Sequence, residues 1–377
     1  MTSPDIYIDI SPAQEEPLTS QGLDIIQPPG NGWHAQFAFA VKIRDFDDLK
    51  KLKWGFNFGS LLEEVLERQR LFIESQHFPG ELRKQPTEFR TLALRFVHEP
   101  ERNSLRLYLL AKVQAHDRKS AFSLAIQTRQ ELESIFPYEY KLDPIDNRIS
   151  FTQETGWNWV RQSSDVFSFL EIEKYEGVLS TGQERIFILG SWNDSMIGNE
   201  QVWRVLAGAK QRIFLNVIIR PVILQDYDVL ALHNIAEYAE KIRKGSVNPA
   251  LLPYIDAAVL NYRKMAESLR RPYLVRIHLV SPERIPEYIP RAIGSALTHT
   301  DKPSPSAPGF QIVLPKSDGE LTNWQQLLLW IEPTAFSPDG YDVRFTRLRN
   351  LVDAQGALSL FRLPFPPEGG IPGVTFE

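Results

Sequence analysis

The clearest pattern of apolar and polar positions lies between residues 89 and 136. Two runs rich in aliphatic and aromatic residues, Phe89–His98 and Leu105–Val113, read as β-strands. The residues between them, Glu99–Ser104, include Pro, Asn and Ser, which favour a turn. Asp117 is a suitable N-cap for a following helix. The apolar stripe of that helix comprises Phe122, Ala125, Ile126, Leu132 and Phe136. The predicted order is strand, strand, helix.

A strand and a helix are predicted upstream of this unit. Strict alternation predicts a strand over Ala35–Ile43. Its larger residues Phe37, Phe39, Val41 and Ile43 share one face. A helical period follows, carried by Leu61, Leu62, Val65, Leu66, Phe72 and Ile73.

The second half of the chain repeats the strand, strand, helix order. Ile213–Leu224 and Tyr273–Val280 are predicted strands, and Ser281 is expected to cap a helix with Pro282 at its first position. The apolar stripe expected for this helix is Ile285, Tyr288, Ile289 and Ala292. Shorter strands are expected at Val166–Leu170 and Arg185–Leu189, and a helix is expected to begin within Val202–Ala209.

A helical hairpin is predicted between the two strands of the second half. Its second helix is expected to start at Asn248-Pro249. The periodic apolar residues of that helix are Ile255, Ala258, Val259, Tyr262, Ala266 and Leu269. The pattern therefore predicts an α+β fold, with mixed or antiparallel sheets covered by helices. Duplicated ferredoxin-like units with a helical hairpin insertion explain the repeated order, although strand, strand, helix is common enough to recur by coincidence.

The expected organisation has four parts. Residues 1–32 form an extended arm with a short strand at Ile6–Ile10, residues 33–150 a first α+β domain, and residues 151–300 a second domain with the helical insertion at 225–270. Residues 301–377 form a linker and a C-terminal α+β segment. Within it we expect strands at Phe310–Leu314 and near Tyr341–Phe345, and a helix at Asn323–Trp330.

Composition narrows the function classes. The 377 residues are 43% hydrophobic and 24% charged, which is typical of a folded protein. The absence of cysteine excludes cysteine nucleophiles, thiolate metal sites and disulfides. A net charge of -5 disfavours a strongly basic nucleic-acid binder. No basic-then-apolar leader and no apolar run of transmembrane length is present, so we expect a cytoplasmic protein.

Tests for catalytic motifs are negative. The sequence contains no P-loop, no Gly-x-Gly-x-x-Gly, no nucleophile elbow and no His-Glu-x-x-His pattern. The pairs His98-Glu99 and His116-Asp117 should lie at opposite ends of the predicted strand pair, so they should not share a metal ion. Asp45, Asp47 and Asp48 are better explained as helix-capping residues than as Mg²⁺ ligands. We therefore predict no catalytic, cofactor-binding or metal residues.

Two features suggest interaction surfaces. Basic residues gather near the ends of the two insertion helices, where they suit the helix dipole. They form a candidate anion or nucleic-acid surface, although Glu267 and the acidic balance argue against it. The set is Lys241, Arg243, Lys244, Arg263, Lys264, Arg270 and Arg271. The second feature is the tail Gly356–Val374, which reads as a strand running into an extended Pro/Gly-rich connector.

The tail resembles the junction that precedes the motor domain in HerA-type ATPases of the FtsK–HerA superfamily. The resemblance covers about twenty residues, including Phe361-Arg-Leu-Pro364 and Ile371-Pro-Gly373, and loosely the α+β order. It implies the non-catalytic N-terminal region of such a protein, with the P-loop motor supplied by another chain. No catalytic residue of the family carries over, because the Walker motifs are absent.

The resulting hypothesis is a non-enzymatic assembly or docking module that partners a HerA-like ATPase through an exposed apolar tail. The docking residues expected in that tail are Phe361, Arg362, Leu363, Pro364, Phe365 and Pro366. The alternatives are a nucleic-acid-binding accessory protein that uses the basic hairpin, and an enzyme of unrecognised class. Homo-oligomerisation stays open in each case.

Overall fold

The computed structural model confirms the α+β class and describes most of the chain. The described residues are 23–26, 32–44, 58–77, 90–146, 151, 153–156, 168–180, 185–190, 192, 196–222, 226–245, 249–268, 272–298, 309–329, 331, 350–365 and 370–377. The predicted strands at Ile6–Ile10 and Tyr341–Phe345 lie outside them, as do Asp45, Asp47 and Asp48.

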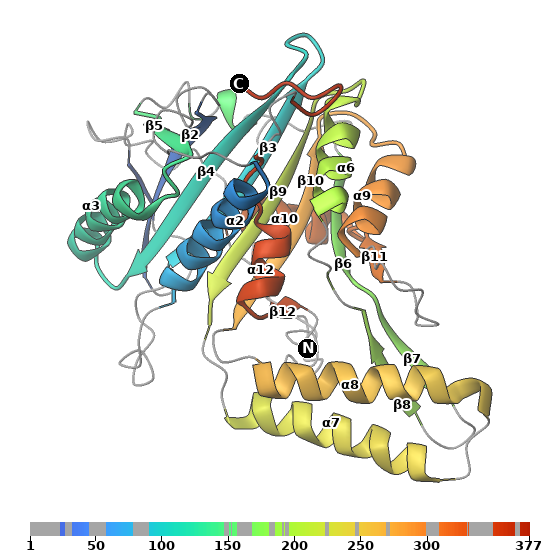
Figure 1. The fold of residues 1–377 in the computed structure, drawn as a ribbon. Coiled ribbons are helices and arrows are strands. Elements are labelled where there is room, and N and C mark those ends of the chain that lie inside the picture. The colour runs from blue at the N-terminus through green and yellow to red at the C-terminus, as the bar shows by residue number, and fades with distance from the viewer. Residues whose placement is uncertain are drawn as a thin grey trace.

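A ten-stranded antiparallel sheet forms the body of the molecule, and its first half is a βαββαβ unit (Figure 1). In chain order this unit consists of β2 (Trp33–Ile43), α2 (Phe58–Ser75), β3 (Arg90–Glu99), β4 (Ser104–Ala115), α3 (Arg118–Ile135) and β5 (Tyr140–Pro144). Its strands lie in the order β5-β2-β4-β3, which is the arrangement of a ferredoxin-like unit. The short strand β1 (Asp24–Ile26) also pairs with β2.

The second half has the same topology. Its elements are β6 (Ser168–Lys174), α6 (Met196–Ala207), β9 (Ile213–Pro221), β10 (Tyr273–Ser281), α9 (Tyr288–Thr298) and β11 (Phe310–Val313). The strand order is β11-β6-β10-β9. Strand β11 thus completes the second unit. The predicted boundary at residue 300 is therefore wrong, because it assigned this strand to the part of the chain that follows the second domain.

The two units meet at one strand pair. Strand β3 of the first unit pairs antiparallel with β9 of the second, from Leu92↔Ile219 to His98↔Ile213. Because these strands hold equivalent positions in the two units, the halves are related by an approximate twofold axis between them. We call the boundary between β3 and β9 the seam.

Local signals account for the first unit. The turn between β3 and β4 contains Asn103 with φ of 52°, a left-handed conformation that asparagine tolerates. Asp117 caps α3 by accepting a hydrogen bond of 2.9 Å from the backbone N–H of Ser120. Both features confirm the prediction for this part of the chain.

Both faces of the sheet are buried in the part of the chain that the structure describes. On the helix face, residues such as Leu92, Leu94 and Phe96 pack with α3, α6, α9 and the C-terminal segment. On the opposite face, Ala93 and Val97 pack with Trp324 of α10 (Asp318–Leu329). Burial on both faces explains why the strands read as nearly continuous apolar runs rather than strict alternations. Helix α10 begins five residues earlier than predicted, after Ser317.

The helical hairpin is confirmed and belongs to a projecting subdomain. It consists of α7 (Asp226–Lys244) and α8 (Leu252–Ser268), with a short 3₁₀ turn at Pro249–Leu251. The hairpin packs against the two-stranded ribbon of β7 (Glu176–Ser180) and β8 (Arg185–Leu189). Figure 1 shows this subdomain beyond one end of the main sheet.

The predicted start of α9 is wrong. Ser281 ends β10, and the helix begins at Tyr288. The Ser281 hydroxyl accepts a hydrogen bond from the backbone N–H of Glu283, but Pro286 disfavours helical backbone at the residue before it. Tyr288 is exposed rather than part of the apolar stripe. Gly294 is a packing position, because a Cβ there would lie 2.3 Å from the Phe310 ring.

The strand predicted at the start of the tail Gly356–Val374 is wrong, because a helix occupies that position. We call residues 350–377 the C-terminal segment. Strand β12 (Leu351–Val352) pairs with the start of β10, and α12 (Ala354–Leu360) follows it. Asp353 caps α12 by accepting a 2.7 Å hydrogen bond from the N–H of Gly356. This cap signal outweighs the run of apolar residues that suggested a strand.

Candidate interaction surfaces

The predicted basic surface is on a hairpin with its own apolar core. Buried residues of α7 and α8 pack on Leu189 of β8, Val222 and Leu274. Those from the helices are Leu232, Ile235, Ala236, Ala239, Ile242, Ile255, Ala258, Val259 and Tyr262. This core confirms the predicted stripe of α8 as far as Tyr262, and it holds the two helices antiparallel with their polar sides outward.

Most of the described basic side chains on the hairpin are paired with carboxylates. Arg243 Nε lies 2.6 Å from Asp256 Oδ1, Lys244 Nζ lies 3.3 Å from Glu240 Oε1, and Arg263 also pairs with Glu240. The hydrogen bond from Lys244, followed by the charges of Arg263 and Lys244, lowers the pKa of Glu240. The carboxylates of Asp256 and Glu240 therefore offset much of the positive charge of the predicted basic surface.

The remaining members of the predicted basic set are not brought together. Lys241 is exposed in the last turn of α7. The side chain of Lys264 and all of Arg270 and Arg271 lie outside the described residues.

The hairpin also exposes apolar side chains that were not predicted from the sequence. Leu260 of α8 is 67% exposed, and Leu230 and Tyr238 of α7 are exposed as well. Asp256, Leu260 and Arg263 follow helical spacing along one side of α8, so the two interhelical ion pairs flank Leu260. The sequence did carry a signal for the exposure of Leu260. It is an apolar residue of the periodic helix that lies outside the predicted core stripe. We call the surface formed by Leu260 and its two flanking ion pairs the hairpin patch. Tyr238 is two residues before Glu240 on α7 and therefore points to a different side of that helix.

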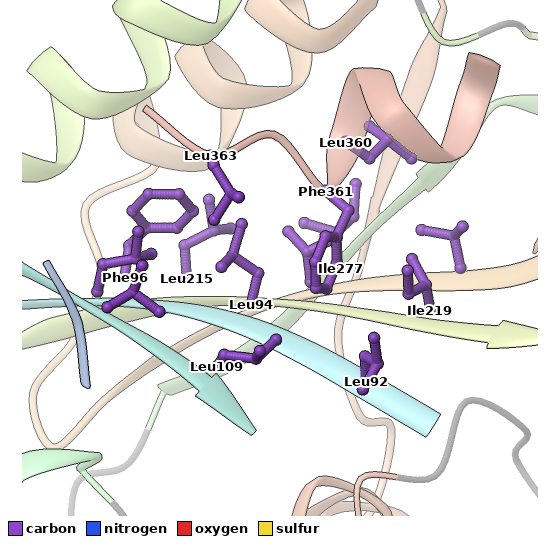
Figure 2. Packing of buried hydrophobic residues seen from close by; sticks show 14 of the residues in the cluster. Leu92, Leu94, Phe96, Leu109, Leu215, Ile219, Ile277, Leu360, Phe361 and Leu363 are labelled. Atoms are coloured by element: carbon purple, nitrogen blue, oxygen red, sulfur yellow. The ribbon is translucent and has the colours of Figure 1, made fainter. Parts of the chain in front are cut away.

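The predicted docking tail is not an exposed patch. Phe361, Leu363 and Phe365 are buried, and so are Arg362 and Pro364, whereas Pro366 lies outside the described residues. Figure 2 shows Phe361 and Leu363 above strands β3, β9 and β10, among Leu94, Leu215 and Ile277. The expectation of exposed apolar residues here is wrong, because the segment fills the core over the seam.

Polar side chains hold the backbone of this segment. The Gln69 side-chain amide of α2 donates to the carbonyl of Leu363 at 3.1 Å and accepts from the N–H of Leu363 at 3.2 Å. The Tyr140 hydroxyl donates to the same carbonyl, and Asn199 of α6 donates to the carbonyl of Ser359 at 3.3 Å. The segment is thus bonded to both units.

A buried lysine anchors the start of the same segment. Lys174 at the end of β6 donates a 2.7 Å hydrogen bond from Nζ to the carbonyl of Leu351. Burial lowers the pKa of Lys174 to about 8, and the charge of Asp353 opposes the shift. The ammonium is protonated at neutral pH and fixes β12 against the second unit.

A row of buried polar residues crosses the opposite face of the sheet. Arg95, Asn216, His278 and Glu171 are successive neighbours on β3, β9, β10 and β6. Arg95 Nε donates to Asn216 Oδ1 at 2.9 Å across the seam. Arg276 and Glu171 form a two-pronged ion pair with N–O distances of 2.7 and 2.8 Å.

The electrostatics of this row fit a structural role. Burial, with the charges of Arg276 and Arg95, lowers the pKa of His278 well below its usual value, so the imidazole is neutral at pH 7. Burial also lowers the pKa of Arg95, but the guanidinium stays protonated at neutral pH, where it lies over the Phe214 ring. This row could have been suspected from the sequence, because each of its members is a polar residue flanked by apolar neighbours in its strand.

The candidate metal pairs are separated as predicted. His98 ends β3 and bonds through Nε2 to the carbonyl of Ala209 at 2.9 Å, whereas His116 follows the opposite end of the β3–β4 pair. No group of three His, Asp or Glu residues suited to a metal ion occurs among the residues that the structure describes. Within the same residues, no helix has the length and apolar character needed to span a membrane.

Comparisons with known proteins give no family. No family model matches the chain, and no curated protein matches it.

Proposed function

We propose that this chain is a non-catalytic assembly module that docks a HerA-type P-loop ATPase through the hairpin patch. The proposal keeps the partner suggested by the tail resemblance, but it moves the docking surface from the buried tail to the projecting subdomain.

The observation that carries the proposal is the difference between the two units. The first unit joins its second and third strands, β3 and β4, with the four residues between Glu99 and Ser104, while the second inserts α7 and α8 between β9 and β10, at the equivalent place. A tight turn suffices to close such a unit, so the second unit does not need the insertion to complete its sheet. The insertion has its own core and exposes Leu260 between two ion pairs, an apolar centre with a polar rim as protein interfaces have.

Nucleic-acid binding is the weaker alternative. The ion pairs of Arg243, Lys244 and Arg263 consume cations that a phosphate backbone would need.

Binding between the purified chain and a purified HerA-type ATPase from the same genome tests the proposal. Leu260→Glu places a charge in the hairpin patch and should weaken the affinity at least tenfold, a loss of about 1.4 kcal/mol. The matched control is Leu314→Glu, because Leu314 is a similarly exposed leucine that follows β11 on the main body. Absence of binding at tens of micromolar, or equal weakening by both variants, would refute the proposal. Stoichiometric ATP turnover by the chain alone would refute its non-catalytic part.

A further inference from the structure

The C-terminal segment is held like a peptide ligand. Phe361 is the C-cap of α12, and Phe361, Leu363 and Phe365 enter apolar clusters. The Gln69 amide bonds both the N–H and the carbonyl of Leu363, as a neighbouring strand would. Main-chain hydrogen bonds combined with pockets for side chains are one way in which folded proteins bind peptides.

The groove that holds the segment is built from both units. Leu61 and Val65 of α2 receive Phe365, and strands β3, β9 and β10 receive Phe361. Further along, Phe376 packs on Trp203 of α6 with ring centroids 5.9 Å apart. The N–H of Leu105, at the start of β4, donates a 2.7 Å hydrogen bond to the carbonyl of Thr375. The described residues of the segment therefore contact the start of β10 through β12 and the start of β4 through Thr375.

These contacts do not require the segment to come from the same copy. Eighteen residues separate Ile331 from Asn350, and a chain of that length reaches at most about 60 Å. A second copy of the chain has the same C-terminal segment, so its segment can make every one of these contacts in the groove.

We propose that the groove over the seam binds the C-terminal segment of a second copy, so that two chains exchange residues 350–377 and form a dimer. The exchanged dimer keeps all contacts of the single chain, which is why such exchange is a low-cost route to a dimer. Within one chain the segment has an effective concentration in the millimolar range, so exchange is favoured when chains refold together at high concentration. The inference does not depend on the ATPase partner.

A cross-linking experiment tests the exchange directly, because the chain has no cysteine of its own. One full-length chain carries Asn199→Cys, a differently tagged chain carries Ser359→Cys, and the two are refolded together and mildly oxidised. A disulfide between the two tagged chains forms above the level of random collision only if the segment of one chain lies in the groove of the other. We expect its yield to rise roughly in proportion to chain concentration and to fall several-fold when Gln69→Ala is added to the first chain.

Two controls make the result decisive. Lys244→Cys in place of Asn199→Cys reports random collision, since Lys244 is on the projecting hairpin. A single chain with both cysteines reports whether the positions can bond at all. If this chain forms its disulfide while the mixed pair yields no more than the Lys244→Cys control at every concentration, the exchange is refuted.

A peptide experiment decides the matter if the double variant forms no disulfide. The full-length chain with Leu363→Ala is mixed with a synthetic peptide of residues 350–377. Binding in trans should raise the Tm of this chain, while a peptide carrying Phe361→Ala and Leu363→Ala should not. The absence of any rise at peptide concentrations up to the millimolar range would overturn the proposal.

Discussion

Replacing Phe361 by alanine should destabilise both units at once. The Phe361 side chain is 1% exposed and packs over β3, β9 and β10. A buried phenylalanine removes at least about 150 Å² from water, which at about 25 cal/mol per Å² corresponds to about 4 kcal/mol. Large-to-small substitutions in cores cost about 3 to 5 kcal/mol, cavity included, so we expect a loss of about 4 kcal/mol.

Urea unfolding followed by tryptophan fluorescence measures this loss, and hydrogen exchange locates it. Because Phe361 lies over the seam, amides in β3 of the first unit and β9 of the second should lose protection together. Leu314→Ala is the control, since the exposed Leu314 should change stability by less than about 0.5 kcal/mol. A loss below about 1 kcal/mol, or loss of protection in one unit alone, would show that the segment does not hold the seam.

Three further predictions concern the polar groups around the segment and the sheet. Gln69→Ala removes the acceptor of the buried Leu363 N–H and one of the two donors to the Leu363 carbonyl, and it should cost about 1 to 3 kcal/mol, measured by urea unfolding; an unchanged midpoint would contradict the role of the amide. Glu171→Gln removes the charge partner of buried Arg276 and should cost about 3 to 5 kcal/mol, whereas a double change to apolar residues should cost less, so equal losses would argue against the pair. Lys174 binds its proton more weakly in the folded chain than in the unfolded chain, so between about pH 8 and 10.5 its contribution to the free energy of unfolding should rise with pH. Lys174→Met should remove this rise, and identical pH profiles of the two proteins would refute it.

Local signals predicted the individual elements well. The strand pair with its turn, the Asp117 cap and the core stripe of α8 follow from patterns a few residues long, and the structure contains all three. The repeated order of elements also pointed to ferredoxin-like units, because order along the chain limits the ways in which strands can be arranged.

Features that depend on contacts between residues far apart in the chain could not be predicted from the sequence. The tail looked like an exposed strand, because nothing within it shows that Gln69, 294 positions away, binds Leu363. The basic hairpin looked like an anion surface, because helical spacing does not show that Glu240 meets Arg263 on the other helix. The pairing of β3 with β9, which joins the two units, likewise has no local signal.

The position of the segment over the seam has a consequence for synthesis of the chain. Gln69 leaves the ribosome 294 residues before Leu363, which at about 5 to 20 residues per second is a delay of roughly 15 to 60 s. Strand β3 is made early in that interval and β9 about halfway through it, and from then on their helix faces lack the C-terminal residues that cover them. Newly made chains therefore expose apolar surface until the segment arrives, and this interval is when they are most open to aggregation or to a chaperone.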